Sequence, residues 1–204
     1  MKKTTQILTS VVMAGALAST INAKDLNEKI VYQNGSQWYV GLSKSNTSGT
    51  REVKYENDSS ASASTSQSST SIKIGKVLAN SDRWEFLSTS MKNKIDGSNN
   101  TQSAFEINGI TSLESLRYKR FLPYIVANLG YWTNKTYYEN TTGKDMNGFG
   151  FGMGIGGIYQ FNNNIEFDIG YNQKVIHWFT DENSYTTELS DTAKGITFAM
   201  NYKF

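Results

Sequence analysis

Apolar and polar residues alternate along most of this chain with a period of two, which is typical of β-strands whose two faces meet different surroundings. The alternation is longest in AKGITFAMNYKF, at the end of the sequence. NIEFDIGYNQKVIHWF repeats the pattern, and Gln173 is the one polar residue on its apolar face. Neither stretch has the 3.6-residue period of a helix, so both are predicted to be strands.

A third alternating stretch, GFGFGMGIGG at residues 148–157, contains the spacing G-x-G-x-x-G at Gly152, Gly154 and Gly157. This spacing binds a dinucleotide only where a strand precedes it and a helix begins on it. No helical period follows, so we interpret the stretch as a strand. Its apolar face carries Phe149, Phe151, Met153 and Ile155, and its other face consists of glycine.

Five weaker segments extend the pattern to eight strands: QWYVGLSKS, SIKIGKVLA, RWEFLSTSM, SAFEINGITSLES and FLPYIVANLGYW. The predicted connections alternate in length, with long ones at 46–70, 134–146 and 179–191, a medium one at 93–101, and short ones at 80–83, 117–120 and 162–163. Residues 57–71 are almost entirely small and polar. Such a segment buries too little apolar area to offset its ordering entropy, so we expect a mobile, exposed loop there.

An even number of alternating strands joined by alternating short and long connections predicts an all-β fold, an eight-stranded antiparallel up-and-down transmembrane β-barrel. Strands can cross a bilayer only as a closed barrel, because every backbone polar group must find its partner within the protein. A soluble exported β-sandwich or lipocalin-like barrel would explain the alternation equally well. The strand count, the loop pattern and the end of the chain favour the membrane barrel.

The first 23 residues have the charged start, the apolar core and the small-residue end of a secretory signal peptide. We therefore expect a signal peptide at 1–23, a short periplasmic segment at 24–35 and the barrel at 36–204. Removing the signal leaves 18 basic and 18 acidic residues, so no nucleic-acid partner is expected. With no cysteine and one histidine, neither a metal site nor a cofactor is expected.

Inside a narrow barrel, small residues are needed to admit large ones. We expect inward-facing Tyr124 and Trp132 to fill the space over a lumen glycine stripe formed by Gly148, Gly150, Gly152, Gly154 and Gly156. Charges in the lumen must be compensated. The predicted lumen charges, which pair with one another or with Lys73, are Glu166, Asp168, Lys174 and Lys203.

A strand that ends in phenylalanine, with apolar residues at every second position before it, resembles the assembly signal of outer-membrane proteins. Here that signal is Ile196, Phe198, Met200, Tyr202 and Phe204. Together with LPYIVANLGYW and GFGFGMGIGGIYQF, it makes residues 36–204 similar to the small outer-membrane barrels of the opacity/OmpX/NspA group and to the membrane domain of OmpA. The resemblance implies a monomer in the outer membrane of a Gram-negative bacterium, assembled by the barrel assembly machinery and surrounded by outer-membrane lipids and lipopolysaccharide.

The function expected from this resemblance is non-enzymatic: a structural or adhesin-like role, in which long extracellular loops bind a host or cell-surface ligand. A small-conductance channel and a lipid-modifying enzyme are the alternatives. An enzyme with a serine nucleophile needs a base such as histidine, and His177 is the only one. Lipid A deacylases carry a serine two residues after their histidine, where this chain has Phe179. A partner in the adjoining loop, Ser184 or Asp181, remains open.

Overall fold

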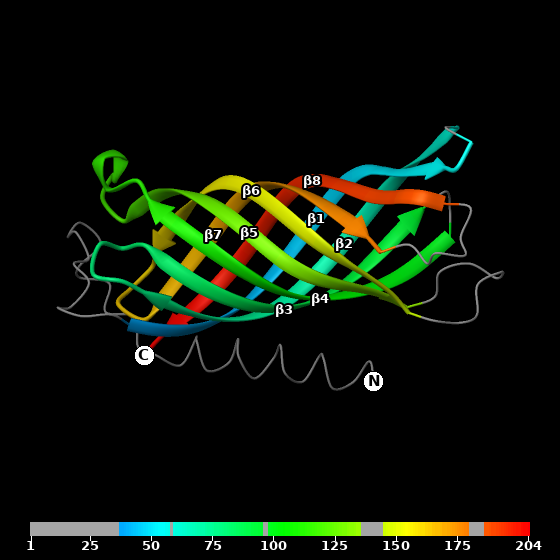
Figure 1. Cartoon of the computed structure of the whole chain (residues 1–204). Helices are drawn as coiled ribbons and strands as arrows, with labels where there is room; N and C mark the ends of the chain where they lie inside the picture. Colours follow the sequence, from blue (N-terminus) through cyan, green and yellow to red (C-terminus); the bar gives the residue numbers. More distant parts are fainter. Residues whose placement is uncertain (1–36, 58, 96–97, 136–144, 180–185) are drawn as a thin grey trace.

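The computed structural model describes residues 37–57, 59–95, 98–135, 145–179 and 186–204. These residues form one closed barrel in which each strand is antiparallel to the next and the last pairs with the first (Figure 1). The predicted signal peptide, residues 24–35, Ser184 and Asp181 lie outside the described residues. The elements are β1 (Gln37–Tyr55), β2 (Ser60–Val77), β3 (Arg83–Ile95), β4 (Ser98–Ser112), the 3-10 turn η2 (Glu114–Leu116), β5 (Phe121–Lys135), β6 (Met146–Gln160), β7 (Ile165–Trp178) and β8 (Thr186–Lys203).

The strands of the barrel are tilted, and the register fixes the tilt. A path taken perpendicular to the strands from Trp38 returns to β1 at Ser48, ten residues further along. Such a stagger is required to close a sheet into a barrel, and strands tilt by roughly 40° as a result. The predicted fold class is confirmed: an eight-stranded, antiparallel, up-and-down barrel.

Two faces of each strand meet different surroundings, as the alternation predicts. On β6, Phe149, Phe151, Met153 and Ile155 are more than half exposed on the outer surface, whereas the intervening residues face the lumen. On β5, Tyr124 and Trp132 are buried inside the barrel, while Ile125 and Leu129 lie outside. The apolar stretches therefore give the barrel an apolar band on its exterior, and the residues between them face the lumen.

The expected loop at 57–71 is wrong. Residues 60–71 belong to β2, which pairs with β1 along its whole length and with β3 from Thr65 onward. Thr65, Gln67 and Ser71 are buried in the lumen, although the segment has almost no apolar side chain. The physical reason is that neighbouring strands supply backbone hydrogen bonds, which order a segment that could not order itself by apolar burial.

The expected alternation of short and long connections is also partly wrong. At the end away from the C-terminus, β1 and β2 are joined by the four residues 56–59, and only residues 96–97 separate β3 from β4. The strands themselves are longer than predicted, and the β1–β2 hairpin projects at this end (Figure 1). At the other end, residues 113–120 include η2 and form a longer turn than the predicted 117–120. Among the described residues, no helix is long and apolar enough to span a membrane.

Candidate functional site in the barrel lumen

Ion pairs cross the lumen in layers, beginning at the end where the C-terminus lies. Arg83 of β3 donates to both carboxylate oxygens of Glu166 of β7, at 2.6 and 3.1 Å. Lys203 of β8 lies 2.9 Å from the same carboxylate. Glu166 and Arg83 are fully buried, and Arg83 also lies over the ring of Tyr39. One carboxylate is therefore compensated by two cations from two other strands.

A second layer is centred on Lys73 of β2. Its ammonium lies 2.7 Å from Glu85 and 3.6 Å from Asp168. Tyr39 donates to Glu85 over 2.8 Å, and Tyr124 donates to Asp168 over 2.7 Å. Each carboxylate thus has a cation and a phenol as partners, which offsets part of the cost of burying charge.

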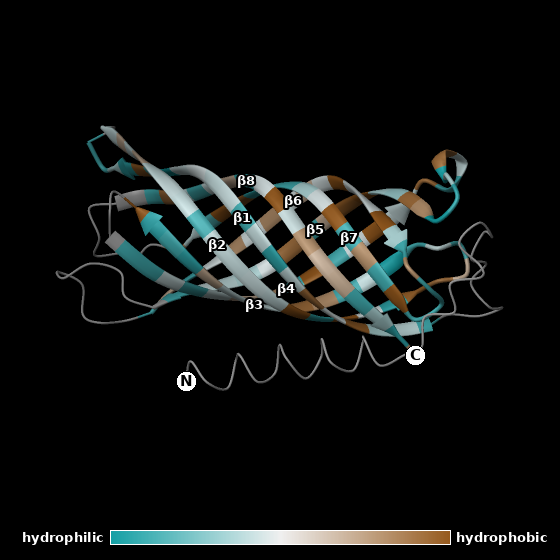
Figure 2. Cartoon of the chain, turned by 180° about the vertical axis from the view of Figure 1, so that it is seen from behind, coloured by the Kyte–Doolittle hydropathy of each residue, from teal (hydrophilic) through white to brown (hydrophobic). Residues whose placement is uncertain are grey.

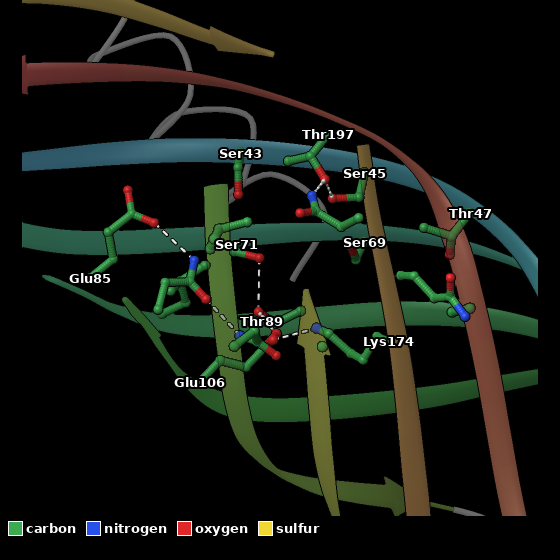
Figure 3. Close-up of a pocket in the computed structure, with 18 of the residues that line it drawn as sticks. Ser43, Ser45, Thr47, Ser69, Ser71, Glu85, Thr89, Glu106, Lys174 and Thr197 are labelled. Atoms are coloured by element: carbon green, nitrogen blue, oxygen red, sulfur yellow. Dashed lines mark hydrogen bonds and ion pairs between the residues drawn. The ribbon is translucent and has the colours of Figure 1, made fainter. Parts of the chain in front are cut away.

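Above this layer the lumen contains a polar cavity of about 120 Å³. Hydroxyl groups line one side, and Glu106 and Lys174 form an ion pair on the other (Figure 3). Thr89 donates to Glu106 over 2.8 Å and also shares a hydrogen bond with Ser71. A cavity of this size and polarity can hold several water molecules.

Apolar side chains close the lumen beyond this cavity, toward the β1–β2 hairpin. Trp132 lies beneath the Lys174 ammonium, which is 4.6 Å from the ring centroid. Further along, Arg51 donates to both oxygens of Asp191 at 2.6 Å, and Trp178 donates to Asp191 at 3.0 Å. The apolar cluster between these groups consists of Met91, Ala104, Trp132, Ile176, Trp178 and Leu189.

Of the residues predicted to be lumen charges, Glu166, Asp168 and Lys203 are buried, and Lys174 is partly buried. In the structure, Glu166 forms an ion pair with Lys203, Asp168 with Lys73, and Lys174 with Glu106. Arg83, Glu85 and Glu106 were not among the predicted lumen charges. The alternation could have identified them, because they alternate with the outward residues Trp84, Phe86 and Phe105 and therefore face inward.

The glycine stripe of β6 lies beneath inward aromatic rings and against the backbone of β7. A Cβ on Gly150 would lie 2.7 Å from the indole nitrogen of Trp132, and one on Gly156 would lie 2.4 Å from the Tyr124 hydroxyl. At Gly148 and Gly152 the nearest atoms are instead backbone oxygens of β7, at 2.4 and 2.7 Å. A Cβ on Gly154 would meet Asn172 at 2.0 Å. Any side chain at these positions would displace a neighbour.

The residues of the predicted assembly signal alternate outward on β8. Phe198, Tyr202 and Phe204 are exposed, and Lys203 between them turns into the lumen. The Phe204 amide donates to the carbonyl of Trp38 over 3.0 Å, so the last residue is still bonded to the first strand. Recognition of this strand by an assembly machinery stays a prediction.

His177 lies on the outer surface of β7, where its ring stacks on Phe151 with 6.2 Å between centroids. The register places Ser190 of β8 directly opposite His177. In the described part of the chain, no group of three or more His, Asp or Glu residues is placed to hold a metal ion.

Layered ion pairs inside a closed barrel with an apolar exterior define a transmembrane β-barrel whose interior is filled by side chains. Comparison with solved structures gives the same class. The neisserial surface protein NspA superposes with a TM-score of 0.54 at 15% identity, covering 84% of this chain and all of that one. OprG from Pseudomonas aeruginosa superposes with a TM-score of 0.50 at 12% identity, covering 88% and 99%.

The chain therefore has the fold of the small eight-stranded outer-membrane barrels, which supports a location in the outer membrane. The outer membrane enzyme PagL is a more distant match, with a TM-score of 0.44 at 12% identity, covering 79% of this chain and 97% of that one. No protein-family model and no curated protein sequence matches the chain.

Proposed function

We propose that this chain is a non-enzymatic outer-membrane protein that displays a rigid polar hairpin for interaction at the cell surface. The observation that carries this proposal is the length of the β1–β2 hairpin, which stays paired as far as Lys54 and Ser60. Beyond Leu42 and Ile72, the outward residues of both strands are polar up to the turn. A paired hairpin of this kind presents side chains in a fixed arrangement, which reduces the entropy lost on binding.

The lumen favours this role over that of a diffusion pore. The polar cavity is separated from one end by the Arg83–Glu166–Lys203 layer and from the other by the apolar cluster around Trp132 and Trp178. Eight strands enclose an interior that side chains nearly fill. In planar bilayers we expect the protein to show no porin-like conductance steps, and such steps would favour the channel instead.

The hairpin can be shortened beyond the buried Arg51–Asp191 pair, with the loss of the β1–β8 pairing from Glu52 onward and of the exposed Lys54–Glu188 ion pair. Arg51 and Ala63 are directly paired, so replacing Glu52–Ser62 with Asn-Gly would close the hairpin there with a two-residue turn. We expect cells displaying this variant to adhere to epithelial monolayers and to each other several-fold less than cells displaying the full chain. Both proteins should retain heat-modifiable migration on gels. Equal adhesion by cells displaying the two proteins would contradict the interaction role of the hairpin and leave only a structural role.

One observation favours a second candidate, an esterase acting on lipids. His177 and Ser190 are register partners on the outer surface, where a base and a nucleophile could meet a lipid ester. Mass analysis of lipid A from cells with and without the protein tests this candidate. A loss of acyl chains that is abolished by both His177→Ala and Ser190→Ala would establish it, and unchanged lipid A would remove it.

A further inference from the structure

The apolar band around the barrel is much taller on one wall than on the other. Each residue of a strand tilted by roughly 40° adds about 2.5 Å of height along the barrel axis. On β6 the exposed apolar residues extend from Tyr159 to Phe149, so the band is about 25 Å tall, the height typical of outer-membrane barrels. On β1 the apolar outward residues begin at Trp38 and end at Leu42, which gives about 10 Å.

The short band is shared by three neighbouring strands. The outward apolar residues are Ile72 and Ile74 on β2, and Trp84 and Phe86 on β3. Figure 2 shows the ribbons of β1 and β2 white to teal over the half that runs away from the C-terminus. On this wall, outward polar residues therefore occupy the depth at which β5 and β6 present apolar side chains.

The polar face above the short band combines lysines with hydroxyls and an amide. We define it by Lys44 and Asn46 of β1, Ser68 and Thr70 of β2, and Lys92 and Lys94 of β3, all exposed on the outer surface. The register places these residues in adjoining rows. Asn46, Ser68 and Lys92 form one row, and Lys44 and Thr70 lie in the row below.

The polar face is positively charged. Lys194 of β8 extends the next row, which passes through Ser48 and Ser66 to Lys94. Within the described residues, the lysines of this face form no ion pair, while the nearby carboxylate of Glu188 is already paired with Lys54. Lys44 lies one outward position above Leu42, so it keeps its stem along the apolar band and lifts its ammonium toward the headgroup level. Lys92 and Lys94 lie higher on the face, beyond the outward residues Ser88 and Ser90.

From this arrangement we infer that the polar face binds the phosphorylated saccharide headgroup of an anionic lipid in the outer leaflet. Lysine ammonium groups attract the phosphates, whereas serine, threonine and asparagine side chains donate to and accept from sugar hydroxyls. Because the apolar band is short here, the headgroup reaches deeper along β1–β3 than on the opposite wall. The inference needs the outer-membrane location, but it does not depend on adhesion through the hairpin.

A second copy of the chain fits the polar face less well. In a two-fold symmetric pair the same surface faces itself. Lysines of β8, β1 and β3 would then face lysines of the partner, and like charges brought together disfavour association. The positive charge of the face therefore argues for an anionic lipid.

The test uses the full mature barrel, refolded in detergent micelles, and native mass spectrometry with added bis-phosphorylated lipid A. The variant is Lys44→Gln/Lys92→Gln/Lys94→Gln. The matched control is Lys76→Gln, because Lys76 lies on the same wall near the opposite end and contacts Trp38. Each lysine near an anionic lipid surface contributes about fivefold in affinity, so we expect the triple variant to bind on the order of a hundredfold more weakly. The control should bind like the wild type.

Several outcomes would overturn the inference. In the first, the wild type and the triple variant retain lipid A equally. In the second, the wild type retains phosphorylated and dephosphorylated lipid A equally. In the third, the wild type forms a lipid-free dimer that the triple substitution abolishes. The last outcome would assign the face to a second copy. Heat-modifiable migration checks that each variant is folded. If the triple variant does not fold, Lys44→Gln and Lys92→Gln are tested singly, each with an expected loss of about fivefold.

Discussion

Arg83 and Glu166 lie on opposite walls of the barrel, on β3 and β7, and are joined by two hydrogen bonds inside the lumen. Both side chains are fully buried. Because strands of opposite walls share no backbone hydrogen bond, this pair and its partner Lys203 link parts of the barrel that the sheet itself leaves unconnected.

Replacing Glu166 with glutamine should strongly destabilise the barrel. The substitution leaves Arg83 and Lys203 buried without their carboxylate, and removing one partner of a buried ion pair costs about 3–5 kcal/mol. Urea unfolding in lipid vesicles measures the loss of free energy of unfolding. The matched control is Glu188→Gln, which breaks the exposed pair with Lys54 and should change stability little. Equal effects of the two substitutions would mean that the lumen pairs do not stabilise the fold.

Alanine at Gly156 should disturb Tyr124. The new methyl group would lie 2.4 Å from the tyrosine hydroxyl and 2.5 Å from the carbonyl oxygen of Ile169, so the ring must move and lose its hydrogen bond to Asp168. Overpacking of this kind costs on the order of 1–3 kcal/mol. The folded fraction, read from heat-modifiable migration after refolding, should fall.

Gly109→Ala is the control for this experiment. Gly109 faces outward, and its nearest neighbour would be a ring carbon of Trp84 at 3.8 Å, an ordinary contact. We expect this variant to refold like the wild type. If Gly156→Ala also refolds fully, the space over the glycines is not needed for assembly.

The serine-rich segment of β2 should be protected in the folded protein. Amides of residues 65–71 lie between β1 and β3, so hydrogen exchange there should be slow, whereas the turn residues Glu56 and Asn57 should exchange rapidly. Proteinase K added to whole cells should cut the turn before it cuts Ser66 or Ser68. Rapid exchange across residues 65–71 would contradict the strand and would mean that the segment is the mobile loop predicted from its composition.

Acid should weaken the contact between β1 and β8 near the hairpin. Lys54 and Glu188 lie beyond the apolar band, and the hydrogen bond from Lys54, together with its charge, lowers the pKa of Glu188. The stabilisation from a lowered carboxyl pKa is present above the ordinary value of about 4.3 and is lost as the pH falls through the lowered value. Carbon NMR titration should show the lowered pKa of Glu188, and Lys54→Gln should raise this pKa back toward its ordinary value. An unchanged titration in the variant would contradict the pairing.

The alternation of residues was enough to predict the strands and their faces. Phe149, Phe151 and Met153 could be placed outside and the glycines between them inside, because side chains on a strand alternate between its two faces whatever its partners are. The same alternation placed Glu166 and Lys203 opposite the apolar residues of their strands. These properties are local, so the sequence by itself determined them.

Only the tertiary structure decided which charges meet and where strands end. Arg83 contacts Glu166 because the register carries them to the same height on opposite walls, and register depends on every strand between them. Ser66 and Ser68 belong to a strand because β1 and β3 bond to their backbone, which no property of a serine-rich segment reveals. The short apolar band on β1–β3 likewise emerged only when neighbouring strands were aligned, since the depth of a residue in the membrane is set by the whole closed barrel.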